Sequence, residues 1–132
     1  MKLRFERQAQ QAIKLTWGHG RYLDPWSIVH LLTGLLLGIV GLWLGLSLWS
    51  TVIITVALTS LYEGFEMLLG IVEDWQNSLL DVLIAAIGVW AAYTLLNTAE
   101  FSTQFITFMA VGILALTLLY AGWRYYLRHR MQ

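Results

Sequence analysis

The chain has 132 residues, of which 58% are hydrophobic and only 12% are charged, about half the charged fraction of a typical soluble domain, so an integral membrane protein is expected. There is no cysteine, which excludes disulfides and thiolate metal sites. Net charge is zero, but all eight Lys and Arg residues lie before residue 22 or after residue 123, a distribution that indicates a membrane protein with basic tails and argues against a nucleic-acid partner.

Residues 1–17 are predicted to form an amphipathic helix on the membrane surface. Apolar residues recur there at helical spacing with basic residues between them, and a partly ordered basic tail is the alternative interpretation. Gly18 and Gly20 end this helix. We therefore divide the chain into a surface helix at residues 1–20 and a single transmembrane domain at residues 21–132.

Four apolar segments follow, each close to the roughly 20 residues that a membrane-spanning helix needs. They are expected at about residues 26–46, 51–72, 78–96 and 104–123. Asp24 can cap the first span, and Pro25 suits its first turn. Four spans place both basic tails on one side, which the positive-inside rule makes the cytoplasm. The predicted fold is an all-α, polytopic membrane protein in the bacterial inner membrane, with four transmembrane helices and an N-terminal amphipathic interfacial helix.

Polar residues recur at similar depth near the cytoplasmic ends of the first three spans. They are His30, Glu63, Glu66, Asn77 and Asp81. Each lies on a stripe of small or polar residues spaced three to four apart, which predicts that it faces the bundle interior. Charged groups in hydrocarbon are costly, and buried polar groups there bind one another. This polar layer is therefore a candidate functional site.

Three interpretations of the layer stay open. It can be a structural hydrogen-bond cluster that fixes the helix register, with acids protonated by burial. It can be a pocket for a substrate or a lipid head group. It can also be a metal site, because His30 with Glu63, Glu66 and Asp81 would suit a divalent ion. A bis-His haem is not expected with one histidine inside the spans, and no known catalytic motif assigns a catalytic residue.

Three segments carry motifs that can be compared with a known family. They are GRYLDPWSIVH at residues 20–30, YEGFE at residues 62–66 and DWQNSLLDVLIAAIG at residues 74–88. Together they resemble a family of small bacterial membrane proteins of unknown function, and the last is also similar to VanZ-like proteins, the group containing the teicoplanin-resistance protein. The resemblance implies site residues at Asp24, Ser27, His30, Glu63, Glu66, Asp74, Asn77, Ser78 and Asp81. Thr33 stands where a second His is common, and Ala85 stands where VanZ-like proteins have Asn.

Two classes of function follow from these patterns. The first is a membrane-embedded site that binds or processes a lipid-linked or amphiphilic molecule, so the expected partners are the lipid bilayer and a lipid-like ligand. The alternative is a non-catalytic accessory or assembly subunit of a larger membrane complex. Its motives are the small size of the chain, its aromatic-rich surface and the glycine-rich first span, which permits close helix contact within the bundle or in a homo-oligomer. A transporter is disfavoured, because no inverted repeat or broken helix is visible.

Overall fold

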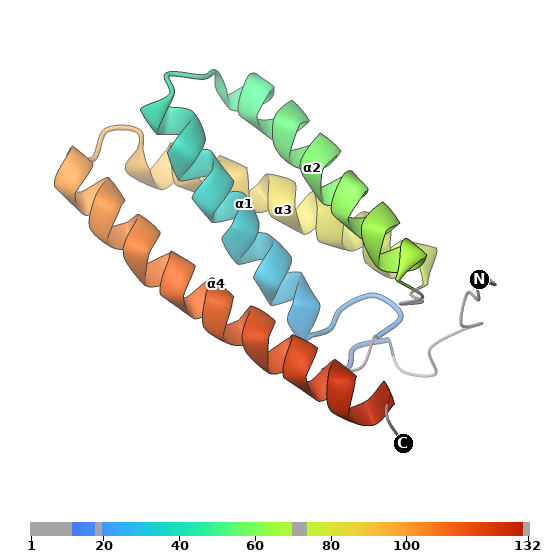
Figure 1. Cartoon of the computed structure of the whole chain (residues 1–132). Helices are drawn as coiled ribbons and strands as arrows, with labels where there is room; N and C mark the ends of the chain where they lie inside the picture. Colours follow the sequence, from blue (N-terminus) through green and yellow to red (C-terminus); the bar gives the residue numbers. More distant parts are fainter. Residues whose placement is uncertain (1–11, 18–19, 70–73, 131–132) are drawn as a thin grey trace.

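The computed structural model of the chain describes residues 12–17, 20–69 and 74–130. These residues form four α-helices, α1 (Pro25–Trp43), α2 (Leu48–Leu68), α3 (Trp75–Leu96) and α4 (Phe101–Arg130). Each is long and apolar enough to cross a membrane, which confirms the predicted all-α class with four candidate transmembrane helices. The helices run side by side, and the start of α1 lies at the same end of the bundle as the end of α4 (Figure 1).

The helix α1 lies at the centre of this bundle. It packs most extensively on α3 and also contacts α4 and α2, while α2 packs mainly on α3. In the described part of the chain, α2 and α4 form no comparable interface, and they lie on either side of α1 (Figure 1). The bundle is therefore open between α2 and α4.

Small residues hold α1 and α3 together at close range. A Cβ atom added to Gly34 would collide with the Ala85 carbonyl group, and one added to Gly38 would lie 2.5 Å from the Ala92 methyl group. From the other side, Gly88 approaches the α1 backbone in the same way. Missing side chains let helix backbones approach one another. These small residues of the first span are therefore used inside the bundle.

The turn between α1 and α2 differs from the predicted boundary. The helix α1 ends at Trp43 instead of near residue 46, because Gly45 takes a left-handed conformation with φ of 66°. The Leu46 amide then donates to the Gly41 carbonyl at 2.9 Å, which closes the helix in a Schellman motif. Ser47 lies in the turn as expected and also caps α2, because its hydroxyl accepts a hydrogen bond from a backbone amide of the first turn.

The predicted N-terminal helix does not extend through residues 12–17, which are not helical. Their backbone pairs with the segment before α1 instead, since Ile13 and Leu23 form an isolated parallel bridge and the Lys14 amide donates to the Leu23 carbonyl at 2.9 Å. The Trp17 ring packs edge-on against Trp26, with ring centroids 5.3 Å apart. The rest of the predicted helix, residues 1–11, lies outside the described residues.

Gln104 connects α4 to its neighbours at the end of the bundle where α1 ends and α4 begins. Its amide nitrogen donates to the carbonyls of Leu96 and Ala99 at 2.9 and 3.2 Å, and its amide oxygen accepts from the Trp43 indole at 2.9 Å. We expect Gln104→Leu to lower the free energy of unfolding by about 1–3 kcal/mol, because it leaves these polar groups unsatisfied.

Thermal unfolding in mild detergent measures this loss, with Thr117→Val as the control. Thr117 is an exposed α4 residue whose hydroxyl bonds only within its own helix. Its replacement should change stability by less than about 0.5 kcal/mol. Equal effects of the two substitutions would contradict the connecting role of Gln104.

Candidate functional site

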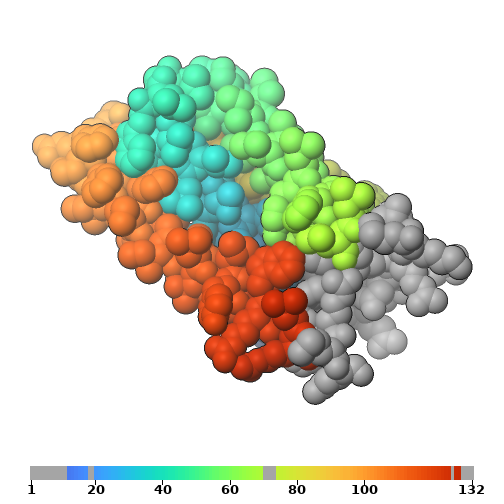
Figure 2. All heavy atoms as spheres, viewed as in Figure 1, coloured from blue at the N-terminus to red at the C-terminus, as the bar shows by residue number. Residues whose placement is uncertain are grey.

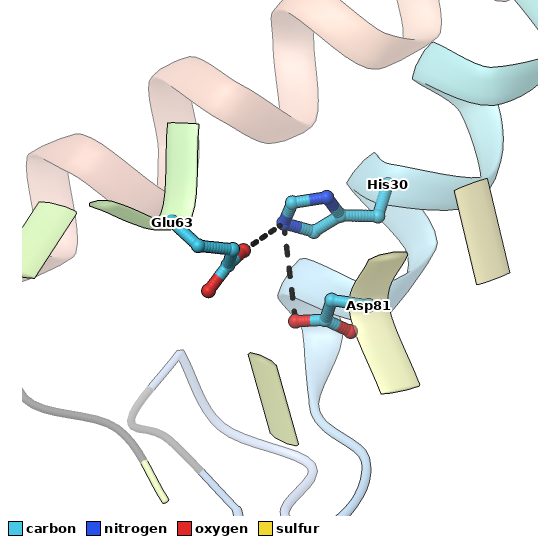
Figure 3. Close-up of side chains that lie close together, drawn as sticks. All are labelled: His30, Glu63 and Asp81. Carbon is cyan, nitrogen blue, oxygen red and sulfur yellow. Dashed lines mark ion pairs between the residues drawn. The ribbon is translucent and has the colours of Figure 1, made fainter. Parts of the chain in front are cut away.

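Side chains from α1, α2 and α3 meet inside the bundle, near the end where α1 begins and α4 ends. His30 Nε2 is 3.3 Å from Glu63 Oε1 and 3.8 Å from Asp81 Oδ2 (Figure 3). His30 and Glu63 are each 6% exposed, and Asp81 is fully buried. Each can offer one nitrogen or oxygen atom such that these atoms all lie within 4.8 Å of one another. We call these three residues the His–Glu–Asp cluster.

The helix faces explain this meeting. Glu63 continues a buried stripe of α2 that places one hydroxyl per turn inside the bundle, formed by Thr51, Thr55 and Thr59. On α3, Asn77 lies one turn before Asp81 on the buried face, and its amide donates to Asp81 Oδ2 at 3.3 Å. The polar stripes predicted from the sequence therefore face inward, and Asn77 lies beside the cluster as expected.

Tyr62 is a neighbour of the cluster that sequence reasoning missed. Its ring packs edge-on against the His30 imidazole, with centroids 5.8 Å apart. Its buried hydroxyl lies near the Glu66 carboxylate and the Trp123 indole. Glu66 is 5% exposed and lies one turn beyond Glu63, beside Tyr62 and outside the cluster. Only the pairing of α1 with α2 shows that Tyr62 meets His30.

The other candidate residues lie at helix N-termini. Asp24 accepts from the Trp26 amide at 2.9 Å and from the Gly20 amide at 3.0 Å, while the Ser27 hydroxyl accepts from the Asp24 amide at 3.4 Å. These contacts form a capping box that fixes the start of α1 and therefore the position of His30. Asp74 is the N-cap residue of α3. Its side chain forms no capping hydrogen bond, and none of the three residues is a member of the His–Glu–Asp cluster.

A cavity of about 540 Å³ extends from the cluster into the open side of the bundle. His30, Thr59 and Tyr62 line its polar part, and the remainder is lined mostly by apolar side chains of α1, α2 and α4, among them Leu36, Leu116 and Phe108. In the space-filling view, atoms of α1 form the floor of a hollow between α2 and α4 (Figure 2). Because α2 and α4 are not packed together, the cavity opens sideways, where lipid would surround a membrane protein.

The chain matches no family model, no curated protein and no solved structure. The resemblance to VanZ-like proteins stays a prediction, and the site is interpreted from its own chemistry. An imidazole and two carboxylates can exchange a proton, bind a cation or accept hydrogen bonds from a ligand. The imidazole and both carboxylates are buried, and the imidazole also borders a mainly apolar cavity.

Proposed function

We propose that this protein binds an amphiphilic or lipid-linked molecule within the membrane. The polar head group would lie at the His–Glu–Asp cluster and the apolar part in the cavity between α2 and α4. The observation that carries the proposal is that His30 belongs to both, since it contacts Glu63 and Asp81 and also lines the cavity. A volume of about 540 Å³ lies within the range of roughly 300–1,000 Å³ typical of ligand pockets.

The proposal includes an orientation in the membrane. The chain has no basic residue from Tyr22 to Trp123, while Arg21 precedes α1 and Arg124 lies toward the C-terminus of α4, at the end of the bundle that holds the cluster. By the positive-inside rule, both termini and the cluster face the cytoplasmic side, in a bacterial inner membrane. We further propose that the protein belongs to the family of small bacterial membrane proteins that its three motif segments resemble, and that it is VanZ-like on the strength of residues 74–88. The accessory-subunit alternative loses part of its motive, because Gly34 and Gly38 pack against α3 within the bundle.

Gly112 of α4 offers a way to fill the cavity without disturbing the bundle. It lines the cavity, and the nearest atom to an added Cβ would be Leu36 Cδ2 at 4.0 Å. Gly112→Leu should therefore fold normally and place its side chain where the apolar part of the ligand would lie. We expect it to weaken lipid binding about tenfold, which is a loss of about 1.4 kcal/mol.

Native mass spectrometry of protein released from nanodiscs of phosphatidylglycerol and phosphatidylethanolamine measures the retained lipid. The matched control is Gly64→Leu on α2, where an added Cβ meets nothing within 4 Å and which does not line the cavity. Wild type and Gly64→Leu should both retain a lipid molecule. The proposal fails if wild type retains none, or if Gly112→Leu retains as much as Gly64→Leu.

A further inference from the structure

We propose that the His–Glu–Asp cluster binds a divalent transition-metal ion, for which Zn²⁺ is the simplest probe. The ligands would be His30 Nε2, one oxygen of Glu63 and one oxygen of Asp81. The inference deepens the proposed function, since it identifies what would hold the head group of the amphiphile. Metal binding can nevertheless be measured without any amphiphile, so the two proposals can fail separately.

The distances fit this assignment. Ligand bonds of about 2.1 Å in tetrahedral coordination separate neighbouring ligand atoms by about 3.4 Å. His30 Nε2 is 3.3 Å from Glu63 Oε1 and 3.8 Å from Asp81 Oδ2. All three ligand atoms lie within 4.8 Å of one another, so small side-chain rotations bring them to coordination distance. One imidazole with two carboxylates suits a borderline ion such as Zn²⁺, Fe²⁺ or Mn²⁺.

The surroundings of the cluster support a bound ion. Metal coordination is one of the few ways to stabilise carboxylates that are removed from water. Asn77 donates to Asp81 Oδ2 at 3.3 Å, the kind of outer contact that orients a metal-binding carboxylate. Ser78, one turn before Asp81 on the buried face of α3, is 9% exposed, and its hydroxyl has no hydrogen-bond partner among the described residues. That hydroxyl is available to a ligand or to a water molecule bound to the ion.

The donor set also indicates which head group the site would take. Three protein ligands leave a fourth position open on a zinc ion, as in catalytic zinc sites. Because His30 lines the cavity, an ion at the cluster would lie at the polar end of the cavity. An anionic oxygen can fill the open position. The site would therefore take an amphiphile with a phosphate or carboxylate head group, whereas a quaternary ammonium head group has no donor atom to fill the open position.

Metal binding is tested on the full chain in mild detergent. The protein is stripped with a chelator, equilibrated with Zn²⁺, freed of excess ion by gel filtration and analysed by elemental mass spectrometry. Wild type and the control Glu100→Gln, outside the cluster, should hold one Zn²⁺ per chain. For Asn77→Ala, a loss of about tenfold in Zn²⁺ affinity is expected. Glu63→Gln and Asp81→Asn keep the side-chain shapes but remove a ligand, so they should lower the Zn²⁺ affinity further.

Cobalt(II) gives a second measurement, because its visible spectrum reports the coordination geometry. An intense tetrahedral spectrum in wild type that is lost in Asp81→Asn would support the assignment. A wild type without stoichiometric Zn²⁺, or a Glu63→Gln variant that elutes like wild type and keeps its Zn²⁺, would overturn it. An ion that remains after both carboxylates are replaced would be adventitious and would overturn it as well.

The amphiphile is added last, as dodecyl phosphate and as dodecyltrimethylammonium. Dodecyl phosphate should bind only the Zn²⁺-loaded wild type, and the cationic detergent should not compete with it. Gly112→Leu should keep its Zn²⁺ and lose dodecyl phosphate. Zn²⁺ binding without amphiphile binding would overturn the proposed function and leave the metal site standing. If dodecyl phosphate binds equally well without Zn²⁺, the inference that the metal ion holds the head group would be overturned.

Discussion

Replacing Gly34 with leucine is expected to remove most of the folded protein, and Gly34→Ala should already lower the free energy of unfolding by about 1–3 kcal/mol. The reason is the contact between α1 and α3, where an added Cβ would collide with the backbone carbonyl of Ala85. A backbone group cannot rotate away as a side chain can, so the two helices would have to separate. Their separation would also move His30 away from Asp81.

The measurement is thermal unfolding in mild detergent together with the monodisperse yield on gel filtration. The matched control is Gly64→Ala on α2, where an added Cβ meets nothing within 4 Å. Since alanine favours a helix over glycine by about 1 kcal/mol, this control should be neutral or stabilising. Equal stabilities for Gly34→Ala and Gly64→Ala would show that the helices do not approach as closely as the structure indicates.

The fold class follows from the sequence because each span can be recognised from its own residues. Apolar length and the polar or glycine-containing breaks between spans depend only on neighbouring residues, and Asp24 before Pro25 marks the start of α1 correctly. The end of α1 was misplaced, because Leu44 and Leu46 are apolar although Gly45 has already turned the chain. At residues 12–17 the helical pattern is overridden by backbone pairing with Leu23, a contact that periodicity does not reveal.

The sequence predicts the depth of the polar layer in the membrane, but not the contacts that its residues make. The spacing of His30, Glu63, Asn77 and Asp81 sets their height in the membrane and their helix face. It does not say which helices touch. The close packing of α1 on α3, the contact of Tyr62 with His30 and the opening between α2 and α4 all depend on that choice. The cavity, on which the proposed function depends, could therefore not be predicted from the sequence.

Replacing His30 with leucine is expected to lower the free energy of unfolding by about 3–5 kcal/mol, because it leaves Glu63 and Asp81 buried without their histidine partner. The same principle predicts that exchanging the whole cluster for apolar residues is neutral or even stabilising. The triple variant with leucine at His30, Glu63 and Asp81 should therefore recover most of the loss. Unfolding is measured with a chelator present, so that bound metal does not contribute, and Glu100→Leu in the exposed loop is the control.

This comparison separates a structural cluster from a binding site. A cluster whose purpose is to hold the helices in register should leave the triple variant less stable than any single variant, and that result would contradict a ligand-binding role. A triple variant as stable as wild type that has lost both Zn²⁺ and dodecyl phosphate would mean that the bundle does not need the polar groups for folding. Groups that are costly to bury and not needed for the fold are explained by a ligand, as we propose for the His–Glu–Asp cluster beside the cavity.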